Sequence, residues 1–478
     1  MIPFGDLAPG LAPTTPGRSA VIDNVLPRAD GSYAPLPQPV TLSASQALSG
    51  PPKGHIAFPK ADGTYVRYVA TASTWEAVGA DGTLTTIATG HAVPPGDRES
   101  FIRFNSKLLG SNITDGLRAF DVESGGATAA VSGAPAARFI FEFAGTVVAL
   151  DCDGDNQLIR NSDLYDHTSW TPGVGVASAQ PVHDGGALVA GVAISQGQAL
   201  IFQREAIRLV TVSAAGPFYT LQLLASNAGA VGARSVVPIR GGAAILDTNG
   251  FKIVSAGGVD EIGRVTGVSE WFLKEVDAAE LVNVEGSYDV FRDIVWWRYR
   301  ASGDSADVYS RAIGYHLSLG KWVTATVSTS ALFSTSLPGY TWDTMPDLSW
   351  DASADVPWND RSLAGGEPLF GGFDANYKFF TFSGTPAAAT LRTAKADLGN
   401  SKLFSRIALI GDGQPTLRIG VADRLSDSIT WKDAVSMTDS GTFPVRGRGR
   451  VVQYELAYAA GDTWTTASGL NHTNGFGR

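Results

Sequence analysis

Short apolar runs separated by turn residues dominate the chain from residue 54 to about residue 394. Several runs alternate apolar with polar positions, which is the period of a half-buried β-strand. Gly, Asp and Asn between neighbouring runs predict hairpin turns, as at residues 144–146 and 247–250. The pattern predicts an all-β fold, and its clearest strands are expected at 64–70, 101–104, 137–143, 146–150, 199–202, 207–211, 243–246 and 251–254.

These strands group into units of roughly 35–50 residues with three or four strands each, the period expected of propeller blades. The units are expected to begin near Gly54, Ser100, Ala137, Leu188, Ser235, Glu285 and Glu367. We therefore predict a β-propeller-like main domain of about six to eight blades over residues 54–394. A large β-sandwich would show a comparable spacing of strands and turns, and it stays open as the alternative.

The two flanking regions have different patterns. Eleven of the 25 prolines fall within the first 59 residues, so residues 1–53 are expected to form a proline-rich extended arm with one short strand at 19–23. Such an arm either lies along its own domain or reaches a neighbour, and disorder of the segment is the competing interpretation. A polar stretch at 394–400 precedes a last β pattern, and residues 395–478 are expected to form a small, separate β-sandwich.

Two segments interrupt the strand pattern. Residues 265–281 carry apolar positions at helical spacing, with Thr266 as the expected N-cap. Residues 328–366 form an expected insertion with weak strand character, rich in Trp, Pro and Asp. Its aromatic side chains could stack on sugars or pack onto the propeller.

Composition and charge narrow the function classes. Charged residues make up 17% of the chain, against roughly 25% in typical soluble domains. The formal net charge of -10 argues against a surface built to grip nucleic acid, which needs Lys and Arg to displace counterions. One cysteine, Cys152, excludes an intrachain disulfide framework and a Cys-cluster zinc site. With neither an export signal nor a membrane-spanning run in the pattern, we expect a soluble protein made in the cytoplasm.

Searches for catalytic motifs return weak matches only. Asp151, Asp153 and Asp155 imitate the start of a calcium loop, but Asn156 and Ser162 stand where its Gly and Glu should be, which favours an Asp-rich turn. The segment from Ser162 to Trp170 resembles the Asp-box of sialidase-type propellers, which is a structural hairpin. A sialidase also needs an arginine cluster, and no diagnostic spacing links Arg160, Arg204, Arg208 and Arg234. We expect no enzyme activity, no cofactor and no metal.

Arg446, Arg448 and Arg450 form the sharpest basic feature of the sequence. Alternate spacing places all three on one side of an extended segment. They could meet phosphate or an acidic neighbouring subunit, and an ordinary solvated strand edge is the competing interpretation. We retain them as a candidate basic strand at a subunit interface.

The order of several short motifs resembles the tail hub, or nozzle, proteins of short-tailed double-stranded DNA bacteriophages, a family that includes packaged-DNA stabilisation proteins. The resemblance covers about half of the chain. Its elements are 143–149 (FAGTVVA), Arg160-Asn-Ser162 leading to Trp170, 199–202 (ALIF), 205–209 (EAIRL), 232–237 (GARSVV), 244–251 (AILDTNGF) and 261–263 (EIG), with the flanking stretches 24–33 (NVLPRADGSY), 369–377 (LFGGFDANY) and 384–391 (GTPAAATL).

The resemblance implies a structural virion protein of the phage tail, assembled in the host cytoplasm as a homo-oligomeric ring, a hexamer. The ring would dock on head-to-tail adaptor proteins, carry tail fibres or spikes, retain packaged double-stranded DNA and let it pass with weak contacts at ejection. The acidic residues of the insertion are then candidates for the channel or its mouth: Asp343, Asp347, Asp351, Asp355 and Asp360. The alternative is a propeller-based carbohydrate-binding protein or glycoside hydrolase of a virion or cell surface.

Overall fold

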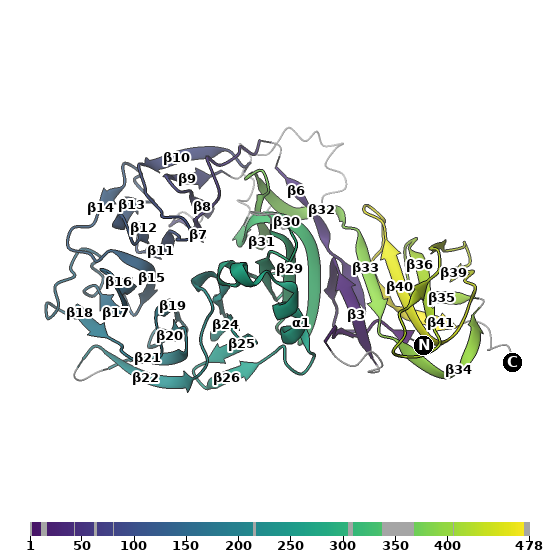
Figure 1. Ribbon diagram of the computed structural model, residues 1–478. Coiled ribbons are helices and arrows are strands. Elements are labelled where there is room, and N and C mark those ends of the chain that lie inside the picture. Colours follow the sequence, from purple (N-terminus) through teal and green to yellow (C-terminus); the bar gives the residue numbers. More distant parts are fainter. Residues whose placement is uncertain are drawn as a thin grey trace.

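The computed structural model describes residues 2–10, 17–42, 44–61, 65–79, 81–213, 217–304, 309–336, 368–404 and 406–472. A ring of β-sheets forms one end of the molecule, and a second β-structure adjoins the ring on one flank (Figure 1). The first and last described strands, Ile2–Pro3 and Ala467–His472, pair with each other in that second structure. The predicted Asp343, Asp347, Asp351, Asp355 and Asp360 fall outside the described residues.

Five four-stranded antiparallel sheets follow one another along the chain. The first contains β7 (Gly54–Pro59), β8 (Tyr65–Ala70), β9 (Thr74–Val78) and β10 (Leu84–Thr89). The second contains β11 (Ser100–Phe104), β12 (Lys107–Asn112), β13 (Gly116–Asp121) and β14 (Ala129–Ala130). The third contains β15 (Ala137–Phe143), β16 (Thr146–Cys152), β17 (Asp155–Asn161) and β18 (Ser178–Pro181). The fourth contains β19 (Leu188–Ala193), β20 (Gln198–Gln203), β21 (Ala206–Val212) and β22 (Tyr219–Ser226), and the fifth β23 (Val237–Ile239), β24 (Gly242–Asp247), β25 (Gly250–Ser255) and β26 (Gly258–Glu261).

These sheets are the blades of a propeller. The first strand of each blade is innermost, and β7 contacts β11, β11 contacts β15 and β15 contacts β19 around the centre (Figure 1). Buried side chains pack between neighbouring blades, for example Phe141 of the third blade with Ile201 of the fourth. The predicted all-β, propeller-like fold is confirmed, and the predicted unit starts Gly54, Ser100, Ala137 and Leu188 each coincide with the first residue of an innermost strand.

One long strand belongs to two blades. The sixth blade contains β27 (Glu285–Asp289), β28 (Ile294–Tyr299), β29 (Tyr309–His316) and the first half of β30 (Lys321–Ser336). From Thr329 onward β30 pairs instead with β31 (Pro368–Asp374) and becomes the inner strand of a seventh blade. The seventh blade is completed by β32 (Phe379–Pro386) and by β6 (Pro37–Thr41) from the N-terminal region. The expected insertion at 328–366 was wrong at its start, since residues 329–336 form a strand that pairs with β31. The strand was not predicted because it is rich in Ser, Thr and Ala and therefore lacks the apolar pattern of the other strands.

Apolar packing between the seventh and the first blade closes the ring. Val69 and Val78 of the first blade share a buried cluster with Phe333, Phe373 and Phe379 of the seventh. The ring closes between strands that are about 280 residues apart along the chain. Within the described residues the propeller thus has seven blades, inside the predicted range.

The second β-structure is a sandwich to which both ends of the chain contribute. One sheet contains β34 (Ala396–Phe404), β40 (Gly447–Tyr458), β36 (Thr416–Ala422), β37 (Thr430–Trp431) and β38 (Val435–Ser436). The other contains β35 (Ile407–Gly411), β39 (Thr442–Phe443) and β41 (Ala467–His472), extended by β1 (Ile2–Pro3), β4 (Val25–Pro27) and β5 (Tyr33–Pro35). Leu417 and Leu456 of the first sheet share a core with Ile407 and Leu470 of the second.

The sandwich and the propeller are joined by a continuous sheet. β3 (Arg18–Asp23) pairs antiparallel with β33 (Ala389–Thr393), β33 pairs with β40, and Asp23 of β3 pairs with Thr324 of β30. A two-residue strand, β2 (Asp6–Leu7), lies parallel to β3. The C-terminal sandwich is therefore not the separate unit that the sequence predicted. The described part of the N-terminal arm pairs with its own chain, which is the first of the two alternatives.

In the part of the chain that the structure describes, helical structure is confined to residues 233–283, before the sixth blade. It comprises two 3₁₀ turns, Ala233–Ser235 and Ala278–Asn283, and α1 (Val268–Glu275). α1 covers an aromatic core, where the Phe251 ring lies 4.8 Å from that of Phe272 and 4.7 Å from that of Trp297. The helix is shorter than predicted, and its N-cap is Gly267 rather than Thr266. Gly267 has a φ of 69°, a value that a threonine in that position would adopt only with strain. Within the described residues no helix is both long and apolar enough to cross a membrane.

Candidate functional site

A cavity of about 450 Å³ opens at one face of the propeller, close to its axis. Its walls come from the segments that lead into innermost strands and from the turns between second and third strands of the second, third and fourth blades. Four arginines line it: Arg98, Arg138, Arg204 and Arg234. We call this cavity the axial pocket.

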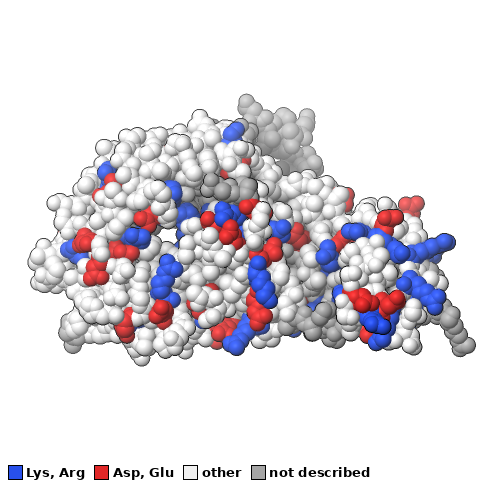
Figure 2. Space-filling view, in the orientation of Figure 1, with Lys and Arg blue, Asp and Glu red and all other residues white. Residues whose placement is uncertain are grey.

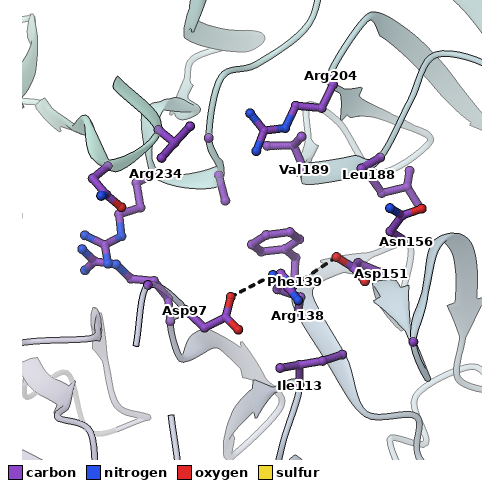
Figure 3. A pocket seen from close by; sticks show the side chains of 18 residues that line it. Asp97, Ile113, Arg138, Phe139, Asp151, Asn156, Leu188, Val189, Arg204 and Arg234 are labelled. Atoms are coloured by element: carbon purple, nitrogen blue, oxygen red, sulfur yellow. Dashed lines mark hydrogen bonds and ion pairs between the residues drawn. The ribbon is translucent and has the colours of Figure 1, made fainter. Parts of the chain in front are cut away.

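Each arginine reaches the axial pocket from a different segment. Arg98 precedes β11, Arg138 lies on β15, Arg204 occupies the β20–β21 turn and Arg234 lies in a 3₁₀ turn before β23. Figure 3 shows Arg204 and Arg234 on different sides of the cavity, with the Phe139 ring between the arginine side chains. Arg204 and Arg234 were considered as part of an arginine cluster from the sequence, but their spacing was not diagnostic. The fold brings them together with Arg98 and Arg138.

Two carboxylates at the rim are bound by one arginine. Arg138 donates from a terminal guanidinium nitrogen to Asp97 Oδ1 at 2.9 Å, and its Nε lies 3.1 Å from Asp151 Oδ2 (Figure 3). Burial raises the pKa of Asp151, against the opposing influence of Arg138. Asp97 and Asp151 thus form their ion pairs with Arg138 and not with the other three arginines of the pocket.

Beneath the axial pocket, a buried ionic cluster forms around Glu285, the first residue of β27. Arg298 donates from Nε to Glu285 Oε2 at 2.7 Å, and a terminal nitrogen of Arg234 lies 3.9 Å from the same oxygen. His55 of β7 lies 3.7 Å from Glu285 Oε1 and stacks on Phe333 of β30. Side chains of the first, sixth and seventh blades therefore meet in this cluster.

The charges of this cluster shape one another. Burial alone would raise the pKa of Glu285, but Arg298, Arg98 and His55 outweigh it and hold the pKa below its ordinary value. Burial lowers the pKa of Arg98 to about 10, which leaves its guanidinium charged at neutral pH. Burial also lowers the pKa of His55, which favours the neutral imidazole. At neutral pH one carboxylate faces three arginines.

The Asp-rich segment after β16 is a turn, as the sequence favoured. Asp151 and Asp153 adopt positive φ values of 55° and 54°. Asp153 accepts from the Ala136 backbone N–H at 3.0 Å and from Arg160 at 3.0 Å, so its two oxygens hold protein groups. Among the described residues no group of three or more His, Cys, Asp and Glu side chains has metal-site geometry.

The Asp-box-like segment is a structural hairpin between β17 and β18. Ser162 is buried and its Oγ accepts from the Val147 backbone N–H at 3.0 Å. Trp170 is also buried and donates from Nε1 to the His167 carbonyl at 2.7 Å. Arg160 and Arg208, the other arginines considered from sequence, do not line the axial pocket: Arg160 bonds to Asp153 and Arg208 to Gln203 and Asp184.

The three arginines of the basic strand lie on one side of it. Arg446, Arg448 and Arg450 are exposed and alternate with the buried Gly447 and Gly449 at the start of β40. Arg450 forms two hydrogen bonds of 2.9 Å with Asp397. Within the described residues the side chains of Arg446 and Arg448 form neither an ion pair nor a hydrogen bond. Figure 2 shows Lys and Arg side chains gathered over the C-terminal sandwich.

The chain is similar to known proteins in structure and not in sequence. No family model and no curated protein matches the sequence. Among solved structures, a catalytically inactive virginiamycin B lyase from Staphylococcus aureus with quinupristin is 10% identical, with a TM-score of 0.41 over 72% of this chain and 97% of that one. The WD40 β-propeller domain of Doa1 is 9% identical, with a TM-score of 0.42 over 72% of this chain and 96% of that one.

Proposed function

We propose that this propeller protein is a structural subunit of the tail hub, or nozzle, ring of a short-tailed double-stranded DNA bacteriophage, and not an enzyme. The observation that carries the proposal, together with the motif order described above, is the join between the two domains. β3 pairs with β30 of the sixth blade at Asp23 and with β33 on its other side, so a continuous sheet runs from the propeller into the sandwich. A ring that retains pressurised DNA needs subunits that do not hinge.

The distribution of charge supports a ring with head-to-tail contacts. Residues 395–478 carry ten Lys and Arg against eight Asp and Glu, whereas residues 1–394 carry 26 against 38. A contact between the sandwich of one subunit and the propeller of the next would therefore pair opposite charges. Arg446 and Arg448 are exposed on the sandwich, where they could make such a contact.

In this proposal DNA passes between subunits and not through a propeller. The cluster around Glu285 brings side chains of the first and sixth blades together, and we therefore place the conduit outside the blades. An acidic surface facing the conduit would keep contacts with the phosphate backbone weak. Adaptor proteins above the ring and fibres or spikes around it remain its proposed partners.

Analytical ultracentrifugation and negative-stain microscopy of the full chain, alone and with the head-to-tail adaptor of the phage that encodes it, test the proposal. Closed rings, hexameric in the expected case, support it. A chain that stays monomeric in both samples contradicts it. The second candidate, a carbohydrate-binding protein or glycoside hydrolase, is favoured by the axial pocket and would be established by turnover or retention of a glycan that depends on pocket residues.

A further inference from the structure

The axial pocket has more positive than negative charge among the groups that surround it. Together with the cluster beneath it, it contains five arginines (Arg98, Arg138, Arg204, Arg234 and Arg298) and three carboxylates (Asp97, Asp151 and Glu285). Two of the carboxylates bind Arg138 and the third binds Arg298. These groups carry two more positive than negative charges. Arg98 and Arg204 pair with none of the three carboxylates, and Arg234 only shares Glu285 with Arg298, at 3.9 Å.

Guanidinium nitrogens in and below the pocket also lack acceptors. Within the described residues, Arg98 Nε and one terminal nitrogen of Arg234 are buried and donate no hydrogen bond. The Arg204 side chain forms no ion pair in the described part of the chain, and it donates a hydrogen bond to the Val231 carbonyl at 2.6 Å. Buried donors without acceptors cost free energy, and a bound anion would satisfy them.

The shape of the pocket limits what can enter it. Phe139, Leu188 and Val189 provide an apolar wall beside the arginines (Figure 3). A volume of about 450 Å³ is of the size that holds a small molecule and far too small for a duplex. Guanidinium groups present their N–H donors in a planar fork that matches the oxygens of a carboxylate or a phosphate.

We propose that the axial pocket binds a small molecule through a carboxylate or phosphate group, with Arg98, Arg204 and Arg234 as donors and Phe139 against its apolar or ring face. Arg138 is the positioning residue, because it holds Asp97 and Asp151 away from the anion. The inference does not depend on the ring proposed above, since each subunit contains all of these residues.

Calorimetric titration of the full chain with inorganic phosphate and, separately, with glucuronate tests the inference. Saturable binding at millimolar concentration is expected for at least one probe, and the probe that binds identifies the group. Arg204→Gln should weaken that binding by about tenfold or more, the value of one charge-assisted hydrogen bond. Arg204 is exposed, so the variant should keep the wild-type melting temperature.

Arg264→Gln is the matched control. Arg264 is 81% exposed and pairs with Glu261 outside the pocket, so the variant loses the same charge from the same domain. Its affinity for the probe should equal that of the wild type. Absence of saturable binding for both probes, or an equal loss of affinity in the two variants, would overturn the inference. Ring assembly is measured separately, so either proposal can fail alone.

Discussion

The side-chain amide of Asn24 donates to the carbonyl oxygen of Ala388 at 2.8 Å. Its Oδ1 accepts from the Thr326 backbone N–H at 2.9 Å, so one buried side chain bridges β30 of the propeller and the approach to β33. Asn24 has a φ of 57°, a left-handed conformation that asparagine tolerates better than most residues. The join between the two domains thus depends on a residue whose conformation and side chain are both specialised.

Asn24→Ala should therefore destabilise the whole chain. It removes two buried hydrogen bonds and places a less tolerant residue in the left-handed region, for an expected loss of about 2–4 kcal/mol in the free energy of unfolding. Urea unfolding followed by tryptophan fluorescence measures it. Asn24→Gly is the control, because it loses the same hydrogen bonds without the backbone strain and should be less damaging by about 1 kcal/mol. Unfolding of the alanine variant at the wild-type urea concentration would contradict this account of the join.

The regular blades were predictable from sequence, and the shared strands were not. The first four blades can be recognised in the sequence because each inner strand follows a turn and contains several apolar residues, as in the strands that begin at Ala137 and Leu188. β6 was missed because Pro37 and Pro39 argue against a strand. Among the described strands β6 pairs with β32 alone, and prolines are tolerated at such a sheet edge. Such an edge is visible only once its partner is known.

The candidate site was predictable only in part. The alternation of Arg446, Arg448 and Arg450 on one side of a strand follows from period two, and the structure shows it. The axial pocket was missed because Arg98 and Arg234 are over 130 residues apart and no local spacing links them. Closure of the ring alone brings them together.

Glu285→Gln should be strongly destabilising. The carboxylate neutralises Arg298 and lies near Arg234 and Arg98, so its loss leaves buried positive charges facing one another. Removing one partner of a buried ion pair costs about 3–5 kcal/mol. Glu280→Gln, which breaks a partly exposed pair with Arg300, should cost about 1 kcal/mol or less. Equal unfolding free energies for the two variants would show that the cluster around Glu285 does not stabilise the propeller.

Glu99 should make stability depend on pH. Burial raises the pKa of Glu99 to about 7, despite a hydrogen bond from Asn112, so the folded state holds a proton that the unfolded state releases above its ordinary pKa of 4.5. Stability therefore falls as pH rises from about 4.5 to 7. Glu99→Gln removes this loss, and its unfolding free energy relative to wild type should rise by up to about 3 kcal/mol across that window.

Neighbouring His91 should act in the opposite direction. Burial lowers the pKa of His91 to about 4, so below pH 6.5 the unfolded state binds a proton that the folded state does not. Stability from this group is present above pH 6.5 and is lost as pH falls towards 4. His91→Gln should therefore lose less stability than wild type on acidification. Thermal melts from pH 4 to 8 check both variants, and parallel curves for both variants and wild type would show that neither group titrates as described.

Reversal of two charges on the basic strand should weaken ring assembly without unfolding the chain. Arg446→Glu combined with Arg448→Glu places negative charge where the proposed contact meets an acidic propeller, and both positions are exposed. Sedimentation velocity should shift from rings to monomers, with an unchanged melting temperature. Arg424→Glu combined with Lys432→Glu, on the same domain, is the control and should still assemble. Rings in the first variant would exclude a role for this strand.

Cryo-electron microscopy of the phage particle that contains this chain tests the hub proposal most directly. The account predicts that the seven-bladed propeller and its joined sandwich fit as one rigid body, repeated as a closed ring around the tail axis below the head-to-tail adaptor, with the DNA path between subunits. Absence of the chain from the tail, or a position as isolated copies away from the axis, would contradict it.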